Sequence, residues 1–306
     1  MERLIRIGTR ESQLAVWQAT EVKKLLALHG YGAQLVYIKS DGDTDLKTPL
    51  YELGVQGIFT KALDIALLNN EIDVAVHSMK DVPTVLAKGV LQAAVLPRAS
   101  VKDILVPEND TAFLDDPQST AVIATSSTRR RAQWLHRFPG HRIESLRGNV
   151  NTRLQKIQEN DWHGAIFAAA GLERIGLRPA NAIDLDWMLP APAQGAIVVV
   201  CKDTDTYCAE ACALMNDKNT ALCVAMERAF LRALLGGCST PISALSEVKD
   251  GRILFRGNIL STDGKLKKEI VKEIDIEDIE QAGASAAMEL LSNGGDMILE
   301  GIRNDR

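Results

Sequence analysis

The residues with the clearest chemical potential are a lysine followed directly by an aspartate, Lys80 and Asp81, close behind an apolar run at 72–76. The run has the length and β-branched content of a buried strand, and Pro83 interrupts regular structure after it. In open α/β sheets, catalytic groups and ligands gather at the carboxyl ends of strands. A carboxylate beside an ammonium group in such a place is a candidate acid–base residue. The structural alternative is that Asp81 caps a turn and Lys80 is solvated.

Arginines with nearby hydroxyl residues form a second group of candidates, because each follows an expected strand or opens an expected helix. These residues are Arg10, Arg129, Arg130, Arg147, Arg153 and Arg174, accompanied by Ser12 and Ser127. Guanidinium groups bind carboxylates and phosphates with two hydrogen bonds, and helix N-termini also favour anions. The pattern predicts a cleft for a small polyanion. The alternative is that several of these arginines form ordinary salt bridges.

Cys238 follows two glycines, Gly236 and Gly237, which allow the backbone to present its thiol on a loop. The alternative is a buried cysteine that acts only as a small apolar residue. No Cys–His pair is recognisable, so a protease-type nucleophile is not indicated. The five cysteines are an odd number at irregular spacing in a chain with no secretory signal, which predicts reduced thiols. They include no CxxC pair, so no metal site is expected. The chain also lacks a P-loop and a GxGxxG motif, which argues against a nucleotide enzyme.

Composition limits the classes of protein to consider. The chain has 306 residues, of which 46% are hydrophobic and 25% charged, as in folded proteins of two or three domains. Its net charge of −5 argues against a nucleic-acid partner. No apolar run approaches the ~20 residues that cross a bilayer, and the N-terminus lacks the apolar region of a signal peptide. We therefore expect a cytoplasmic protein with no membrane partner.

Strands and helices alternate through residues 1–96, which predicts an α/β domain with a largely parallel sheet. The apolar run at 196–200 is expected to return to this sheet, so the first domain comprises 1–96 and 196–216. The loop after Gly42 has no clear periodicity and is long enough for a lid. A second α/β domain is expected over 100–190, where Asn149 or Asn151 could cap a helix.

From 218 to 306 the pattern changes to α+β. A helix at 222–235 precedes three strands, and the chain is expected to close with a helix at 279–291. The strands are joined at Asp250-Gly251 and Asp263-Gly264, which are strong hairpin signals. The predicted fold class is therefore α/β plus α+β, in three domains.

Taken together, the motifs resemble those of the porphobilinogen deaminase family, also called hydroxymethylbilane synthases. The matching stretches run through nearly the whole chain: Gly8-Thr9-Arg10 with Ser12, Val76 to Pro83, Thr125-Ser126-Ser127 with Arg129-Arg130, Leu146 to Val150 with Thr152-Arg153, Ala170-Gly171-Leu172, Gln194-Gly195-Ala196, Glu227-Arg228 and Gly236-Gly237-Cys238. The resemblance implies two α/β domains like those of periplasmic binding proteins around a hinged cleft, plus the small C-terminal domain.

The resemblance also implies a monomeric transferase of porphyrin and heme biosynthesis. It joins four porphobilinogen molecules into linear hydroxymethylbilane, releases ammonia at each step, and carries a dipyrromethane cofactor linked to Cys238 by a thioether. Asp81 is implied as the catalytic carboxylate. Together with Asp81, the residues implied to hold the cofactor are Lys80, Ser127, Arg129, Arg130 and Arg147. Those implied to hold substrate are Arg10, Ser12, Phe59, Arg147, Arg153, Arg174 and Gln194.

Some positions depart from the family pattern. Glu52 and Gln56 stand where the family usually has lysines, which predicts fewer contacts from the loop to substrate carboxylates. Ala193 and Val200 stand where glycine and glutamate are frequent. The alternative function is a non-catalytic cytoplasmic binding protein for a small polycarboxylate. Asp81 and Cys238 favour the enzyme, because a binding protein needs neither.

Overall fold

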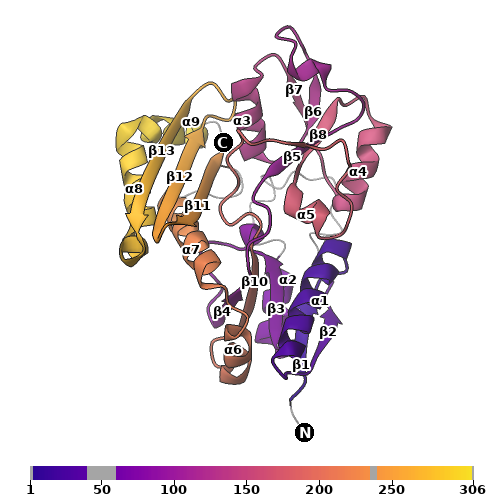
Figure 1. The fold of residues 1–306 in the computed structure, drawn as a ribbon, viewed down its shortest axis with the longest axis vertical. Helices are drawn as coiled ribbons and strands as arrows, with labels where there is room; N and C mark the ends of the chain where they lie inside the picture. The colour runs from indigo at the N-terminus through magenta and orange to yellow at the C-terminus, as the bar shows by residue number, and fades with distance from the viewer. Residues whose placement is uncertain (1–2, 40–59, 235–239, 305–306) are drawn as a thin grey trace. The chain divides into compact units, whose positions relative to one another are not determined.

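The computed structural model describes residues 3–39, 60–234 and 240–304. It divides into two compact units, and each is described by itself (Figure 1). Unit 1 comprises the described residues of 1–46, 55–99 and 194–222, and unit 2 comprises those of 100–193 and 223–306. None of the helices in these ranges has both the length and the apolar character that crossing a membrane requires.

Unit 1 is built on a sheet with strand order β2-β1-β3-β10-β4. Its strands are β1 (Ile5–Thr9), β2 (Ala33–Tyr37), β3 (Val74–Ser78), β4 (Val90–Val95) and β10 (Ile197–Lys202). Strand β1 runs parallel to β2 and β3, whereas β10 runs antiparallel to β3 and β4. The predicted return of the chain at 196–200 is confirmed. Four of the five strands run in one direction, as the prediction of a largely parallel sheet requires, and only the returning strand β10 runs in the opposite direction.

Helices α1 (Gln13–Leu28) and α6 (Thr206–Ala213) share one hydrophobic core with this sheet, and α2 (Lys61–Leu68) also belongs to unit 1. In that core Val22 of α1 and Cys208 of α6 are both fully buried with Val74 of β3. Apolar residues at helical spacing on α1 therefore pack against alternate residues of the strand. This packing holds β3 in place, and with it the residues that directly follow the strand.

Unit 2 begins with a second sheet whose strand order is β7-β6-β8-β5-β9. Its strands are β5 (Asp103–Pro107), β6 (Val122–Ala124), β7 (Arg142–Glu144), β8 (Gly164–Ala168) and β9 (Ile183–Asp184). Strand β6 is parallel to β7 and β8, and β5 is antiparallel to β8 and β9. Across both sheets two parallel pairings are followed by two antiparallel ones, so the predicted similarity of the two α/β regions is confirmed.

The helices of this second α/β region are α3 (Thr128–Arg137), α4 (Val150–Glu159) and α5 (Ala169–Glu173). Ile157 of α4 and Leu172 of α5 belong to one hydrophobic core on the sheet, and Trp134 of α3 belongs to another. Adjacent residues of β5 alternate between the two cores, since Ile104 lies in the first and Leu105 in the second. Both faces of the sheet are therefore covered.

The C-terminal part of unit 2 contains a three-stranded antiparallel sheet in the order β11-β12-β13. This part comprises β11 (Ile242–Lys249), β12 (Arg252–Leu260), β13 (Lys267–Asp275), α8 (Ile279–Leu290) and α9 (Asp296–Asn304). It also includes most of α7 (Lys218–Ala233), whose first residues are counted in unit 1. Asp250 and Gly251 have φ values of 51° and 77°, as expected of a two-residue hairpin turn. The prediction of a single closing helix is wrong, because the chain kinks at Gly294, with φ 92°, and continues as α9.

Candidate active site

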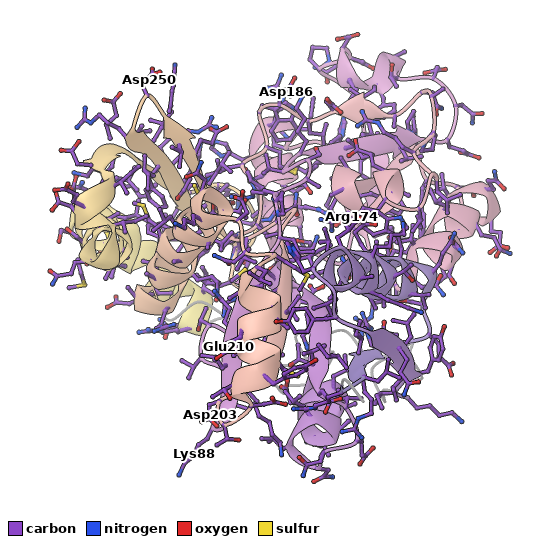
Figure 2. All side chains as sticks on the ribbon, turned by 60° about the horizontal axis from the view of Figure 1, so that its bottom comes forward. Lys88, Arg174, Asp186, Asp203, Glu210 and Asp250 are labelled. Atoms are coloured by element: carbon purple, nitrogen blue, oxygen red, sulfur yellow. The ribbon has the colours of Figure 1, made fainter. Side chains whose placement is uncertain are left out.

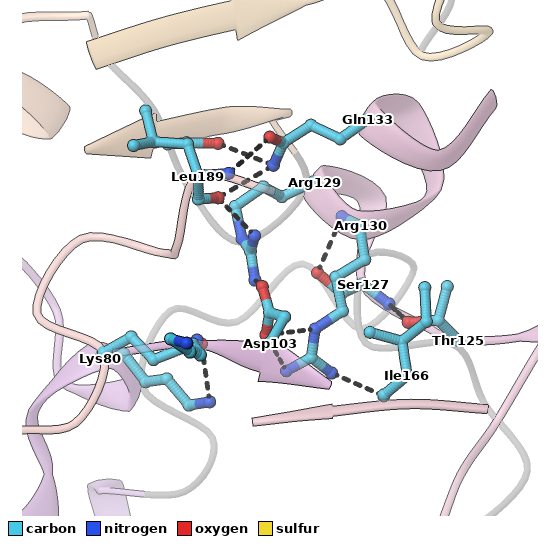
Figure 3. Close-up of polar contacts among 12 residues, drawn as sticks. Lys80, Asp103, Thr125, Ser127, Arg129, Arg130, Gln133, Ile166 and Leu189 are labelled. Atoms are coloured by element: carbon cyan, nitrogen blue, oxygen red, sulfur yellow. Dashed lines mark hydrogen bonds and ion pairs between the residues drawn. The ribbon is translucent and has the colours of Figure 1, made fainter. Parts of the chain in front are cut away.

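The lysine and aspartate lie in a single 3₁₀ turn, Met79–Asp81, directly after β3. The turn is anchored at its start, where the buried Met79 donates its N–H to the carbonyl oxygen of Ala196 at 3.0 Å. Lys80 is half-buried, and its Nζ donates to Oε1 of Gln194 at 3.3 Å (Figure 3). Asp81 is exposed, and no hydrogen bond or ion pair joins its carboxylate to another of the described residues. Its carboxylate is thus accessible on an anchored turn, and the turn-cap alternative gains no support.

Arg10 and Ser12 lie between β1 and α1, and Ser12 is the N-cap of that helix. Its Oγ accepts the N–H of Ala15 at 3.4 Å. Because β1 and β3 run parallel, Arg10 follows the strand next to the one that leads to Asp81. The sequence correctly predicted that these strand ends belong to one sheet.

Two buried polar side chains near this sheet edge had no predicted role. Gln18 of α1 donates from Nε2 to Oγ of Ser78, the last residue of β3, at 2.9 Å. Burial, together with the positive charge of Arg10, lowers the pKa of His77 to about 3, so its imidazole is neutral at neutral pH. His77 belongs to a motif quoted above, but an apolar strand context alone does not distinguish a functional histidine from a structural one.

Ser127, Arg129 and Arg130 lie at the N-terminus of α3 in unit 2, as predicted. Ser127 caps the helix, and its Oγ accepts the N–H of Arg130 at 3.4 Å. Both arginine side chains are buried and converge on Asp103, which is fully buried at the start of β5 (Figure 3). Burial lowers the pKa of Arg129, and the negative charge of Asp103 counteracts this effect.

The contacts of the two arginines differ. Arg130 donates from Nε and Nη2 to Oδ1 of Asp103 at 3.0 and 2.7 Å, and from Nη1 to the carbonyl oxygen of Ile166 at 2.9 Å. Arg129 pairs with Oδ2 of Asp103 at 2.7 Å and donates from Nη1 to the carbonyl oxygen of Leu189 at 2.7 Å. Sequence reasoning missed Asp103. The only signal was a lone carboxylate at the start of an apolar run.

Arg147, Arg153 and Arg174 are half-buried and belong to the same unit. Asn149, the first of the two predicted candidates, caps α4 by accepting the N–H of Thr152 at 3.0 Å. Arg153 donates from Nε to the carbonyl oxygen of Gly148 at 2.7 Å, which holds its stem against the turn before the helix. Arg174, labelled in Figure 2, directly follows α5. Burial lowers the pKa of its guanidinium to about 10.

The structure therefore brings Lys80, Asp81 and Gln194 together in unit 1, and Ser127, Arg129 and Arg130 together in unit 2. Phe59 and Cys238 lie outside the described residues, as do Glu52 and Gln56. The described donors are mostly guanidinium, ammonium and hydroxyl groups. Such groups recognise carboxylates.

Both α/β regions thus carry cationic groups at strand ends and helix starts, which defines the class: an α/β enzyme for anionic small molecules with a carboxylate as its candidate catalyst. Two family models match the chain. Residues 5–210 match "Porphobilinogen deaminase, dipyromethane cofactor binding domain", and residues 221–292 match "Porphobilinogen deaminase, C-terminal domain". The chain belongs to the porphobilinogen deaminase family.

Curated relatives agree over nearly the full length. A porphobilinogen deaminase of Syntrophotalea carbinolica is 43% identical over 300 residues, covering 96% of this chain and 95% of the relative. One of Carboxydothermus hydrogenoformans is 41% identical over 309 residues, covering 100% and 99%. The chloroplastic enzyme of Pisum sativum is 43% identical over 304 residues, covering 95% and 82%. The family places the chain among the transferases of tetrapyrrole biosynthesis that use a dipyrromethane cofactor.

Among solved structures, the periplasmic VFT2 domain of Bordetella pertussis BvgS matches with a TM-score of 0.43 and 11% identity, covering 69% of this chain and 86% of that domain. The methionine-binding protein MetQ matches with a TM-score of 0.43 and 11% identity, covering 74% and 94%. These matches are partial likenesses of fold.

Proposed function

We propose that the chain joins four porphobilinogen molecules head to tail into linear hydroxymethylbilane and releases one ammonia for each molecule joined. The observation that carries this proposal is the exposed carboxylate of Asp81 on an anchored turn at the end of β3. The family match supports the reaction class. No described contact favours the alternative of a non-catalytic binding protein.

Asp81 is proposed as the catalytic carboxylate. Its position after a buried strand allows it to donate a proton to the leaving amine and then to accept the proton lost when the new bond forms. Between these steps, its negative charge would stabilise the positive charge that develops on the substrate ring as ammonia leaves. Lys80, half-buried beside it, would contribute a fixed positive charge toward substrate carboxylates.

Each porphobilinogen carries an acetate and a propionate, so every elongation step adds two negative charges to the binding site. We propose that the substrate is held by arginine, hydroxyl, amide and aromatic groups: Arg10, Ser12, Phe59, Arg147, Arg153, Arg174 and Gln194. Their guanidiniums would offer bidentate hydrogen bonds to these carboxylates as the product lengthens.

When bound, dipyrromethane supplies the pyrrole unit from which the chain grows. We propose that Cys238 anchors it through a thioether and that it is held by Lys80, Asp81, Ser127, Arg129, Arg130 and Arg147. The donor set fits an anionic group: the Nε of Arg129 is buried and has no hydrogen-bond partner among the described residues. An orphaned buried donor of this kind is suited to an anionic acceptor.

We further propose three domains, comprising 1–96 with 196–216, 100–190, and 218–306, and a monomer that works in the cytoplasm. The separate three-stranded sheet from β11 to β13 supports a distinct C-terminal domain. The strand β10 supports the assignment of the segment after 196 to the first domain.

Intact mass tests the cofactor assignment. The purified chain is compared with Cys238→Ala and with Cys223→Ala, a matched control at a buried cysteine of α7. We expect the extra mass of two linked pyrrole units in the wild type and in Cys223→Ala, and none in Cys238→Ala. If the wild type carries no extra mass, the measurement is repeated after incubation with porphobilinogen. A wild type that still gains nothing contradicts the proposal.

A further inference from the structure

The contacts of Asp103 carry an inference beyond the proposed function. Asp103 is 0% exposed, and it is the carboxylate on which Arg129 and Arg130 converge. The side chains of the two arginines are only 6% and 9% exposed. Two guanidiniums and one carboxylate leave one net positive charge in a site with little access to water. An excess charge in such a site needs an acceptor that is not part of the cluster.

The two arginines do not share this charge equally. Every nitrogen of the Arg130 guanidinium donates a hydrogen bond, two of them to Asp103 and one to a strand carbonyl. Arg130 is thus committed to holding the cluster together. Arg129, by contrast, keeps a buried Nε–H with no hydrogen-bond partner among the described residues. The unused donor and the excess charge therefore belong to the same side chain.

The orientation of Arg129 is fixed from a second side. The carbonyl oxygen of Leu189 accepts hydrogen bonds from Arg129 and from Nε2 of Gln133 at 2.9 Å, and Gln133 accepts the N–H of Leu189 at 2.9 Å (Figure 3). Nε2 of Gln133 also lies 3.1 Å from the hydroxyl of Ser243 on β11. A guanidinium held at two of its nitrogens has little freedom, so its buried Nε–H points in one direction.

We propose that Asp103 is a positioning residue that sets the charge of the Arg129–Arg130 pair to one net positive unit, so that the pair receives a single carboxylate through Arg129. This inference rests on the proposed binding of the dipyrromethane cofactor by these arginines. Within that proposed set of cofactor-binding residues, Arg129 contacts the carboxylate directly, and Arg130 contributes by holding Asp103 in place.

A charge series tests the proposal, with dipyrromethane loading measured by intact mass after apoprotein is incubated with porphobilinogen. Asp103→Asn raises the cluster to two positive charges, Arg130→Gln lowers it to zero, and the double variant restores one. The control is Asp184→Asn, which removes another carboxylate that pairs with two cations, Lys102 and Arg178, but is half-buried. Thermal unfolding is recorded for each variant so that loading is compared between folded proteins.

We expect each single variant to load about tenfold more slowly than Asp184→Asn, the loss of roughly one charge-assisted hydrogen bond. We expect the double variant to load several-fold faster than Arg130→Gln. A merely structural role predicts that rescue appears only in the thermal unfolding of the double variant, because Asp103 and Arg130 are in contact and their effects on stability are coupled. The folded variants would then all load as fast as Asp184→Asn. If Asp103→Asn does not fold, the comparison of Arg130→Gln with the double variant decides whether Asp103 sets the charge of the arginine pair.

The proposal is overturned if the double variant loads no faster than Arg130→Gln, or if a folded Asp103→Asn loads as fast as Asp184→Asn. Failure of the wild type itself to gain mass has a different meaning. It overturns the proposed cofactor attachment, on which this inference depends, whereas a loaded wild type without rescue overturns only the role of Asp103.

Discussion

The buried Gln18 of α1 donates a hydrogen bond of 2.9 Å to the half-buried Ser78, the last residue of β3. It links the helix that Ser12 caps to the strand that leads into the turn of Lys80 and Asp81. The bond therefore ties a proposed substrate-binding segment to the proposed catalytic turn within one unit.

Ser78→Ala should destabilise unit 1, because it leaves the amide of Gln18, only 3% exposed, without this acceptor. We expect a loss of about 1–3 kcal/mol in the free energy of unfolding, measured by urea titration. The control is Ser292→Ala, whose hydroxyl bonds the Met288 carbonyl on the surface and should cost less. Equal effects in the two variants would contradict the importance of the bond between Gln18 and Ser78.

Asp81→Asn should abolish most activity without affecting folding, because the side chain is exposed and the substitution is nearly isosteric. Loss of a general acid–base group lowers kcat by about 10²–10⁴-fold. The measurement is the rate of hydroxymethylbilane formation, with the melting temperature recorded alongside. Asp203→Asn, an exposed aspartate after β10, serves as the control and should retain full activity. Retained turnover in Asp81→Asn would rule out the proposed role.

His77 should make the folded protein sensitive to mild acid. Burial and the charge of Arg10 lower its pKa to about 3 from 6.5, so between these values the unfolded chain binds a proton that the folded chain does not. Stability from this residue is complete above about pH 6.5 and falls by about 1.4 kcal/mol per unit as the pH drops below that value. His77→Gln should make the free energy of unfolding depend less on pH between pH 6 and 4. A series of urea unfolding curves recorded across this range measures the difference. An unchanged slope would count against a buried neutral imidazole.

Gly251 and Gly301 should respond to the same substitution with opposite signs. Apart from the adjacent residues and the backbone of the same helix, no heavy atom lies within 4 Å of a Cβ added at either position. Gly251, however, has φ 77° in a hairpin turn, whereas Gly301 lies within α9. Gly251→Ala should cost about 1 kcal/mol because of its backbone conformation, whereas Gly301→Ala should add about 0.5–1 kcal/mol through helix propensity. Thermal unfolding of both variants checks the difference. A stabilising Gly251→Ala would contradict the turn geometry.

Local patterns predicted those parts of the fold that depend on neighbouring residues. The Asp-Gly pair at 250–251 predicted the hairpin because both residues must adopt positive φ, and the apolar run at 196–200 predicted a central strand. Strand β4 was not predicted, although it pairs with β10, because its sequence has no distinct alternation. The direction of β10 depends on where the chain returns, which no local pattern specifies.

The candidate site was predictable in residue type but not in pairing. A helix start rich in arginine predicts anion binding, and Arg129 and Arg130 do lie at that start. Their shared partner Asp103 is distant in sequence, and whether a guanidinium faces an internal carboxylate or a ligand depends on tertiary packing. The motifs therefore predicted which arginines belong to the site. The charge balance of the cluster could be determined only from the structure, which shows their shared partner Asp103.

The position of β10 determines when unit 1 can assemble during synthesis. This strand lies between β3 and β4, so β4 has no other route into the sheet, and yet it follows the entire second α/β region in the chain. In a nascent chain that ends before 197, the group β2-β1-β3 and the strand β4 both have unpaired edges, because the strand that joins them has not been made. Long-range pairing of this kind slows folding. The second α/β region, continuous in sequence, can acquire its sheet first, and the region that carries Asp81 is completed only afterwards.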